Sequence, residues 1–111
     1  MPSSVLERDV TAAVVRFMTE RGWVAKRRNV GLLYTKDGRP VRIGKPGEPD
    51  WMFVHRQHGY LEVEMKRPGQ TPDKHQAEYL ATVRALGIEA TWTDSAEKFE
   101  RWYAATYETV S

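Results

Sequence analysis

The segment from residue 46 to residue 66 constrains the fold of this chain most, because a turn, an apolar run and an alternating run follow one another there. It opens with a loop rich in proline and glycine that ends at Asp50. Residues 51–56 begin with an apolar run, and residues 60–66 then alternate between apolar and polar or charged side chains. Such alternation is typical of a strand with one buried face. The two runs are therefore predicted to pair as a β-hairpin.

This hairpin would bring charged side chains together at one of its ends. Asp50 precedes the first strand, so antiparallel pairing places it near Glu64 and Lys66 at the end of the second strand. Two carboxylates and an ammonium group at a strand end can hold a divalent metal ion and a water for phosphodiester hydrolysis. In the alternative interpretation, Asp50 is a turn residue after proline, and Glu64 and Lys66 are solvated residues of a strand.

A helix and a strand are predicted before this hairpin. An apolar stripe at helical spacing indicates an amphipathic helix over residues 4–21. Ser4 is its expected N-cap, Glu7 is the capping-box partner, and Gly22 ends the helix. The following residues, 23–30, are predicted to form a strand with a basic end.

Turn and capping signals divide the rest of the chain. Asp37-Gly38 between short apolar runs predicts a second hairpin. Thr71 and Pro72 are expected to begin a helix as its N-cap and first helical residue. The run 88–93 is predicted to be a strand that follows this helix.

The last helix is expected to begin at Asp94, with Glu97 as its capping-box partner. The whole order predicts an α/β fold in which helices pack on a mixed sheet. Strand 88–93 follows a helix, so it can lie parallel to strand 60–66 through a right-handed crossover.

Length and composition exclude several classes of protein. With 111 residues, the chain is long enough for one domain, 1–111, and too short for two. No apolar run approaches the ~20 residues that span a bilayer, and no basic segment followed by an apolar one indicates a signal peptide. The absence of cysteine excludes disulfides and thiolate zinc sites, and it fits a reducing cytosol.

Positive charge is concentrated in one segment. Residues 26–45 contain seven basic residues and one acidic residue, which is the pattern expected of a phosphate-binding surface. The alternative is a solvated basic face, and alternate strand residues face opposite sides, so half of the set can miss a nucleic acid. The candidate DNA contacts are Lys26, Arg27, Arg28, Arg39, Arg42 and Lys45.

The two charged motifs, in this order, resemble those of a known nuclease superfamily. The predicted order αβββαβ with an additional C-terminal helix is similar to the restriction-endonuclease-like core of the PD-(D/E)xK nucleases. Over residues 4–103 the chain resembles the VRR-NUC (virus-type replication-repair nuclease) family. The residues that carry the resemblance are Gly47-Glu48-Pro49-Asp50, Glu64-Met65-Lys66, Glu7, Asn29-Val30-Gly31 and Gln76.

The resemblance implies a DNA endonuclease that depends on Mg²⁺ or Mn²⁺. Oxygen ligands without a cysteine or histidine cluster also favour a hard metal ion over zinc. The implied metal ligands are Glu7, Asp50, Glu64 and the backbone carbonyl of Met65. The implied catalytic residues are Asp50, Glu64, Lys66 and Gln76.

Three residues near this set keep an open interpretation. The predicted capping box explains Glu7 without any metal, and Gln76 is equally well explained as an exposed polar helix residue. Glu62 is a second acid on the same strand face, about 6.5 Å from Glu64. The spacing to the lysine favours Glu64 as the ligand.

The four tryptophans, 23, 51, 92 and 102, fall on apolar faces and are interpreted as core or interface residues.

The expected function is structure-selective cleavage of branched or duplex DNA, with Holliday junctions as the substrate implied by the resemblance. Two symmetric cuts need two copies of a single-site chain, so a homodimer is expected. No membrane association and no nucleotide cofactor are expected, and the expected location is the interior of a bacterial or phage-infected cell.

Three other functions stay open. The first is a nickase or flap nuclease of a replication-repair complex. The second is a DNA-binding module that does not cut, although the intact set of Asp50, Glu64 and Lys66 argues against it. The third is a small interaction protein that docks a replication partner.

Overall fold

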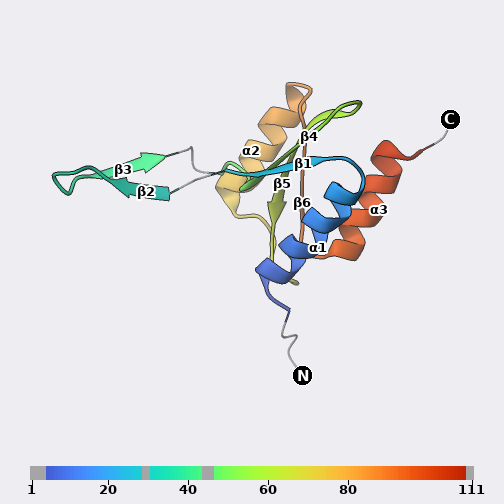
Figure 1. Ribbon diagram of the computed structural model, residues 1–111, viewed down its shortest axis with the longest axis horizontal. Helices are drawn as coiled ribbons and strands as arrows, with labels where there is room; N and C mark the ends of the chain where they lie inside the picture. Colours follow the sequence, from blue (N-terminus) through green and yellow to red (C-terminus); the bar gives the residue numbers. More distant parts are fainter. Residues whose placement is uncertain (1–4, 29–30, 44–46, 110–111) are drawn as a thin grey trace.

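The computed structural model describes residues 5–28, 31–43 and 47–109. Its centre is a mixed four-stranded sheet in the order β1-β4-β5-β6 (Figure 1). The β4–β5 hairpin and the parallel pairing of β6 with β5 are as the sequence predicts, and β1 pairs antiparallel with β4. The strands are β1 (Val24–Arg27), β4 (Trp51–His55), β5 (Gly59–Met65) and β6 (Glu89–Thr93).

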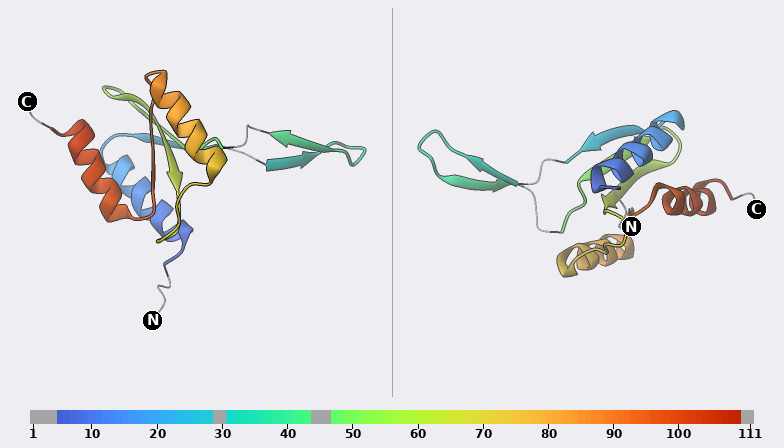
Figure 2. Two further views of the ribbon diagram at one scale, coloured as in Figure 1. Left: turned by 180° about the vertical axis from the view of Figure 1, so that it is seen from behind. Right: turned by 90° about the horizontal axis from the view of Figure 1, so that it is seen from below.

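Three helices cover the two faces of this sheet. Helices α1 and α3 lie on one face and α2 lies on the other (Figure 2). The larger core lies under α1 and α3, and a smaller core joins α2 to β6. The helices are α1 (Glu7–Glu20), α2 (Lys74–Ala85) and α3 (Ala96–Tyr107). The described part of the chain contains no helix long and apolar enough to cross a membrane.

The predicted second hairpin forms a sheet of its own. Strands β2 (Gly31–Tyr34) and β3 (Pro40–Ile43) pair antiparallel around a turn in which Gly38 has a positive φ of 86°. This hairpin stands away from the four-stranded sheet (Figure 1). Because it is inserted between β1 and β4, the elements around the main sheet follow the order α1, β1, β4, β5, α2, β6, α3.

The start of α1 differs from the prediction. Its N-cap is Leu6, whose backbone N–H donates to the Asp9 carboxylate at 2.7 Å, while the expected cap Ser4 lies outside the described residues. The capping role predicted for Glu7 is therefore wrong, since Asp9 fills it. Glu7 is instead the first helical residue, and its carboxylate is available for another role.

The end of α1 follows the prediction. Gly22 has a positive φ of 89°, its N–H donates to the carbonyl of Thr19, and the N–H of Trp23 donates to the carbonyl of Met18. This pair of bonds closes the last turn of a helix. The strand predicted over 23–30 is confirmed for the residues of β1 only.

Helix α2 begins later than predicted. Its N-cap is Asp73 and not Thr71, because Asp73 and Gln76 form a reciprocal capping box with two bonds of 2.9 Å. Two paired backbone groups stabilise this start more than the single hydroxyl contact that Thr71 would offer.

Helix α3 also begins one residue later than predicted. Ser95 is its N-cap and accepts the N–H of Lys98, whereas the expected cap Asp94 accepts the N–H of Gly69 at 2.9 Å. Asp94 therefore ties the loop after β5 to the end of β6 instead of capping a helix.

Candidate metal centre

Three carboxylates from distant parts of the sequence meet at one end of the sheet. They belong to Glu7 at the start of α1, Asp50 just before β4, and Glu64 near the end of β5. One oxygen of each lies within 4.8 Å of the others. The antiparallel register produces this meeting, because Trp51 pairs with Val63 and the preceding Asp50 therefore lies opposite Glu64. The sequence predicts the meeting of Asp50 and Glu64, whereas it leaves the position of Glu7 beside them open.

Glu64 is the most unusual of the three carboxylates. Its side chain is only 5% exposed. Oε1 accepts a hydrogen bond from Nε2 of Gln76 at 2.9 Å and lies 3.8 Å from Nζ of Lys66. Oε2 is buried and has no hydrogen-bond partner among the described residues. An unpartnered buried carboxylate oxygen is costly, so this atom fits a bound cation.

The electrostatics of Glu64 agree with its geometry. Burial raises the pKa of the Glu64 carboxyl to about 7, and the charge of Asp50 acts in the same direction. The ammonium group of Lys66 and, to a smaller extent, the nearby backbone N–H of Asp50 oppose this shift, and Glu7 adds a smaller repulsion. Glu7 is exposed and Asp50 is half-buried, and a cation between the three carboxylates would relieve their mutual repulsion.

The turn that carries Asp50 is held from two sides. Gly47 has a positive φ of 89°, and a Cβ added there would lie 2.4 Å from the carbonyl oxygen of His75 in α2. From the other side, the backbone N–H of Arg28 donates to the carbonyl of Asp50. The same first turn of α2 supplies Gln76, so α2 binds Glu64 directly and lies close to the turn that leads to Asp50.

Lys66 and Met65 complete the end of β5. The backbone N–H of Lys66 donates to the carbonyl of Thr93 at 2.8 Å, which fixes the end of β5 against β6. The Met65 side chain is buried in the larger core. Its backbone carbonyl directly follows Glu64, and its role as a metal ligand stays a prediction.

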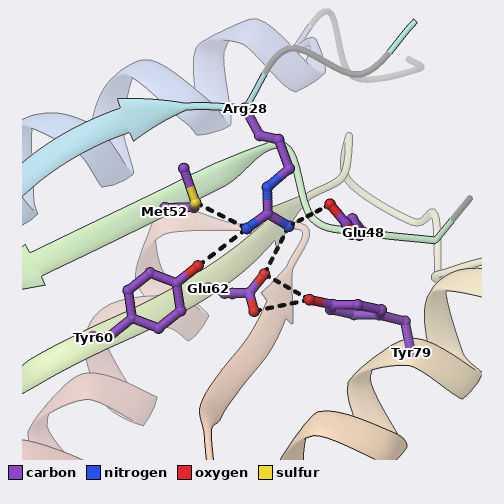
Figure 3. A network of polar contacts seen from close by, with 6 residues as sticks. All are labelled: Arg28, Glu48, Met52, Tyr60, Glu62 and Tyr79. Carbon is purple, nitrogen blue, oxygen red and sulfur yellow. Dashed lines mark hydrogen bonds and ion pairs between the residues drawn. The ribbon is translucent and has the colours of Figure 1, made fainter. Parts of the chain in front are cut away.

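Glu62, two residues earlier on β5, is engaged in a different set of contacts (Figure 3). Nη1 of Arg28 contacts carboxylate oxygens of Glu62 at 3.0 Å and of Glu48 at 2.9 Å. The hydroxyl of Tyr79 donates to Glu62 at 3.0 Å, and Nη2 of Arg28 donates to the hydroxyl of Tyr60 at 3.1 Å. Glu62 therefore lies outside the group of three carboxylates, and local donors satisfy it.

These contacts bear on the predicted DNA contacts of the basic segment. The guanidinium of Arg28 is bound by two carboxylates inside the molecule, so it is not available to contact DNA. Arg39 lies in the turn of the β2–β3 hairpin, away from the carboxylates, and pairs with Asp37 at 3.0 Å. Lys45 and the side chain of Arg42 lie outside what the structure describes.

Lys26 and Arg27 are exposed neighbours on β1, and they differ in position. Arg27 lines a groove of about 700 Å³ that also contains Asp50, Trp51 and the face of α1 from Glu7 to Thr19. Lys26 does not line this groove, because adjacent strand residues point to opposite faces.

Sequence reasoning missed this groove and the second face of α1 that forms it. The signal was present as a second stripe at helical spacing, beside the buried one, with an arginine near each end. The members of this stripe that line the groove are Arg8, Thr11, Ala12, Val15, Arg16 and Thr19.

No protein-family model, no curated protein and no solved structure matches this chain. The residues of the site and their arrangement are therefore the observations that bear on function.

Proposed function

We propose that this protein is a Mg²⁺- or Mn²⁺-dependent DNA endonuclease of the VRR-NUC type. The observation that carries the proposal is Glu64, a buried carboxylate with an unpartnered oxygen beside Asp50 and Glu7. A purely structural acid at this depth would have its oxygens satisfied, as those of Glu62 are. Lys66 at 3.8 Å from Glu64 adds the cation that such a nuclease needs beside its metal ligands.

The order of the elements supports the same proposal. Helix α1 is followed by the three sheet strands β1, β4 and β5, then by α2 and β6. This is the αβββαβ order expected for the PD-(D/E)xK superfamily, with β2–β3 as an insertion and α3 as the additional helix. The motif that ends at Asp50 precedes the second sheet strand, and Glu64-Met65-Lys66 lies at the end of the third, which supports this comparison.

Glu7, Asp50 and Glu64 would hold the metal ion, together with the Met65 carbonyl. Their donors are all oxygens, the ligand type of Mg²⁺ and Mn²⁺. When bound, the ion supplies Lewis-acid activation of the phosphate and of the attacking water.

The chain's own residues have separate roles in this proposal. Lys66 orients the attacking water by a hydrogen bond and offsets negative charge that develops on the phosphate. Gln76 holds Oε1 of Glu64, which leaves Oε2 available to the metal ion. The oxygen of water then bonds to phosphorus and loses a proton to solvent as the bond to the 3′-oxygen breaks. The 3′-oxygen takes up a proton, and the products are a 5′-phosphate and a 3′-hydroxyl.

The proposed substrate is branched DNA inside a bacterial or phage-infected cell. Paired cuts in a Holliday junction require two sites, and the described chain carries one such group of carboxylates, so this activity needs a homodimer. The second candidate, cleavage of a flap or nicked strand, needs only one copy. The groove beside Asp50 favours this candidate, as argued below.

A cleavage panel tests the proposal. The substrates are a four-way junction, a three-way junction, a flap, a nicked duplex, a plain duplex and a single strand, each with Mn²⁺, Mg²⁺ or EDTA. We expect metal-dependent cuts that EDTA and Lys66→Ala abolish. Lys98→Ala is the matched control, because Lys98 is exposed and pairs with Asp94 on α3.

The other outcomes identify the competing functions. Tight metal-independent DNA binding without cleavage would indicate the non-cutting module, and no DNA affinity at low salt would indicate an interaction protein. Calorimetric Mn²⁺ binding that Asp50→Ala leaves unchanged would contradict the proposed metal centre.

A further inference from the structure

The groove along α1 extends from the proposed metal ligands Glu7 and Asp50. Its α1 face runs from Glu7 to Thr19, which is about 18 Å at the rise of an α-helix. The groove has a volume of about 700 Å³ and is open to solvent.

The charge of the groove is complementary to a phosphate backbone. Three arginines line it: Arg8, Arg16 and Arg27. Arg8 and Arg27 form no ion pair with any residue that the structure describes. Arg16 lies 3.8 Å from Glu20, and both side chains are largely exposed, so this pair holds the arginine weakly. The acids in the groove, Glu7 and Asp50, are the proposed metal ligands at one end.

Apolar groups line the groove between these charges. Ala12 and Val15 of α1 are small, and the half-buried ring of Trp51 lies beside them. The Trp51 ring stacks on Phe53, with centroids 6.2 Å apart and an interplanar angle of 22°, so packing holds its position. A fixed aromatic ring among arginines is the combination that binds unpaired bases without sequence preference.

We propose that this groove binds one unpaired DNA strand and leads it to the metal centre. The arginines contact its phosphates, and Trp51 contacts a base. The inference rests on the proposed nuclease function and narrows its substrate to branched DNA with a single-stranded arm, such as a flap. A fully paired four-way junction would not use the groove.

Binding without cleavage tests the groove separately from the chemistry. The probe is fluorescein-labelled oligo-dT, measured by fluorescence anisotropy with EDTA present. We expect Ala12→Glu to weaken binding about tenfold or more, because it fills the groove and adds negative charge beside the phosphates. Ala13→Glu is the matched control, since this exposed neighbour on α1 does not line the groove.

A second pair of variants tests the charge of the groove without filling it. Arg27→Gln is expected to weaken oligo-dT binding severalfold, whereas Lys26→Gln on the other face of β1 should leave it nearly unchanged. Circular dichroism and Mn²⁺ calorimetry on each variant check that the fold and the metal centre persist.

The results separate the groove from the nuclease. Equal effects of Ala12→Glu and Ala13→Glu, or competition by a blunt duplex as strong as that by oligo-dT, would overturn the groove proposal. Metal-dependent cleavage lost in Lys66→Ala would still support the nuclease. If instead no substrate is cut but only Ala12→Glu weakens oligo-dT binding, the strand-binding groove stands and the nuclease function fails.

Discussion

Glu62 and Glu64 lie on the same face of β5, two residues apart, and the surroundings of their carboxylates differ. Both are buried, with 2% and 4% of the residue exposed. Glu62 accepts from the guanidinium of Arg28 and from the hydroxyl of Tyr79. Glu64 has a partner for one oxygen and none for the other among the described residues. Burial alone therefore does not identify a functional acid; the state of its partners does.

Glu62 nevertheless contributes to the site that contains Glu64, through Arg28. The Arg28 guanidinium that neutralises Glu62 also binds Glu48, two residues before Asp50. The backbone of Arg28 holds Asp50 directly. Glu62 thus helps to anchor the turn that carries Asp50, a proposed metal ligand, and Glu64 is left to bind the proposed metal ion.

The largest expected effect is a difference in DNA cleavage between variants of Glu64 and of Glu62. Glu64→Gln should lower kcat for DNA cleavage about a thousandfold or more, because a lost metal ligand removes several kcal/mol of transition-state stabilisation. Glu62→Gln should keep cleavage within about tenfold of wild type. Single-turnover kinetics with Mn²⁺ measure both. An equal loss in the two variants would contradict the division of roles.

The next effect separates the two acids by stability. Arg28→Met leaves Glu62 buried without its cation, and we expect the free energy of unfolding to fall by about 3 kcal/mol. Urea denaturation measures this change. Arg39→Met is the control, because the side chains of the Arg39–Asp37 pair are 78% and 62% exposed and such pairs contribute about 0–1 kcal/mol. Similar losses in both variants would show that Arg28 is not a structural anchor.

A third effect concerns pH. In the metal-free fold the Glu64 carboxyl has a pKa of about 7, whereas its ordinary value is 4.5. Between these values the folded protein binds more protons than the unfolded chain, so stability falls as pH rises and the loss is complete above pH 7. The expected loss is on the order of 2–3 kcal/mol.

Urea denaturation in EDTA at pH 5 and pH 8, with Glu64→Gln as the control, isolates this contribution. The variant should lack this fall in stability, and saturating Mn²⁺ should reverse it in the wild type because metal binds the deprotonated carboxylate. A wild type and a variant with the same pH dependence would show that the Glu64 pKa is not raised.

The sequence predicts the meeting of Asp50 and Glu64 more clearly than it predicts the contacts of Glu62. Asp50 and Glu64 meet because an apolar run and an alternating run, joined by a short turn, pair as adjacent strands, and both runs can be recognised in the sequence. The partner of Glu62 is 34 residues away on β1, and no local pattern indicates that β1 pairs with β4 so as to bring Arg28 there. The sequence shows that basic residues are concentrated in residues 26–45. Which of them form internal ion pairs and which stay exposed depends on packing.

The starts of the helices and the groove likewise depend on contacts that the sequence alone does not show. Thr71 and Asp73 are both good caps, and only the reciprocal bond with Gln76 decides between them. The second stripe of α1 is visible in the sequence, yet a stripe becomes a groove only when α1 is placed beside Arg27 and Trp51.

The smallest expected effect tests how the anchored turn controls the metal centre. Gly47 and Gly69 have the same positive φ of 89°, so alanine at either position is strained by about 1–2 kcal/mol. They differ in space, because a Cβ at Gly47 meets the His75 carbonyl at 2.4 Å and one at Gly69 meets nothing within 4 Å. Gly47→Ala must therefore displace the turn or the start of α2.

That displacement reaches both proposed ligands, since the turn carries Asp50 and the start of α2 carries Gln76, which holds Glu64. We expect Gly47→Ala to weaken Mn²⁺ binding about tenfold by calorimetry, and Gly69→Ala to leave it unchanged while losing similar backbone stability. If both variants keep wild-type affinity, the turn tolerates movement and Asp50 is not fixed by α2. If only Gly47→Ala loses affinity, the packing of this turn against α2 is needed to position the proposed metal ligands.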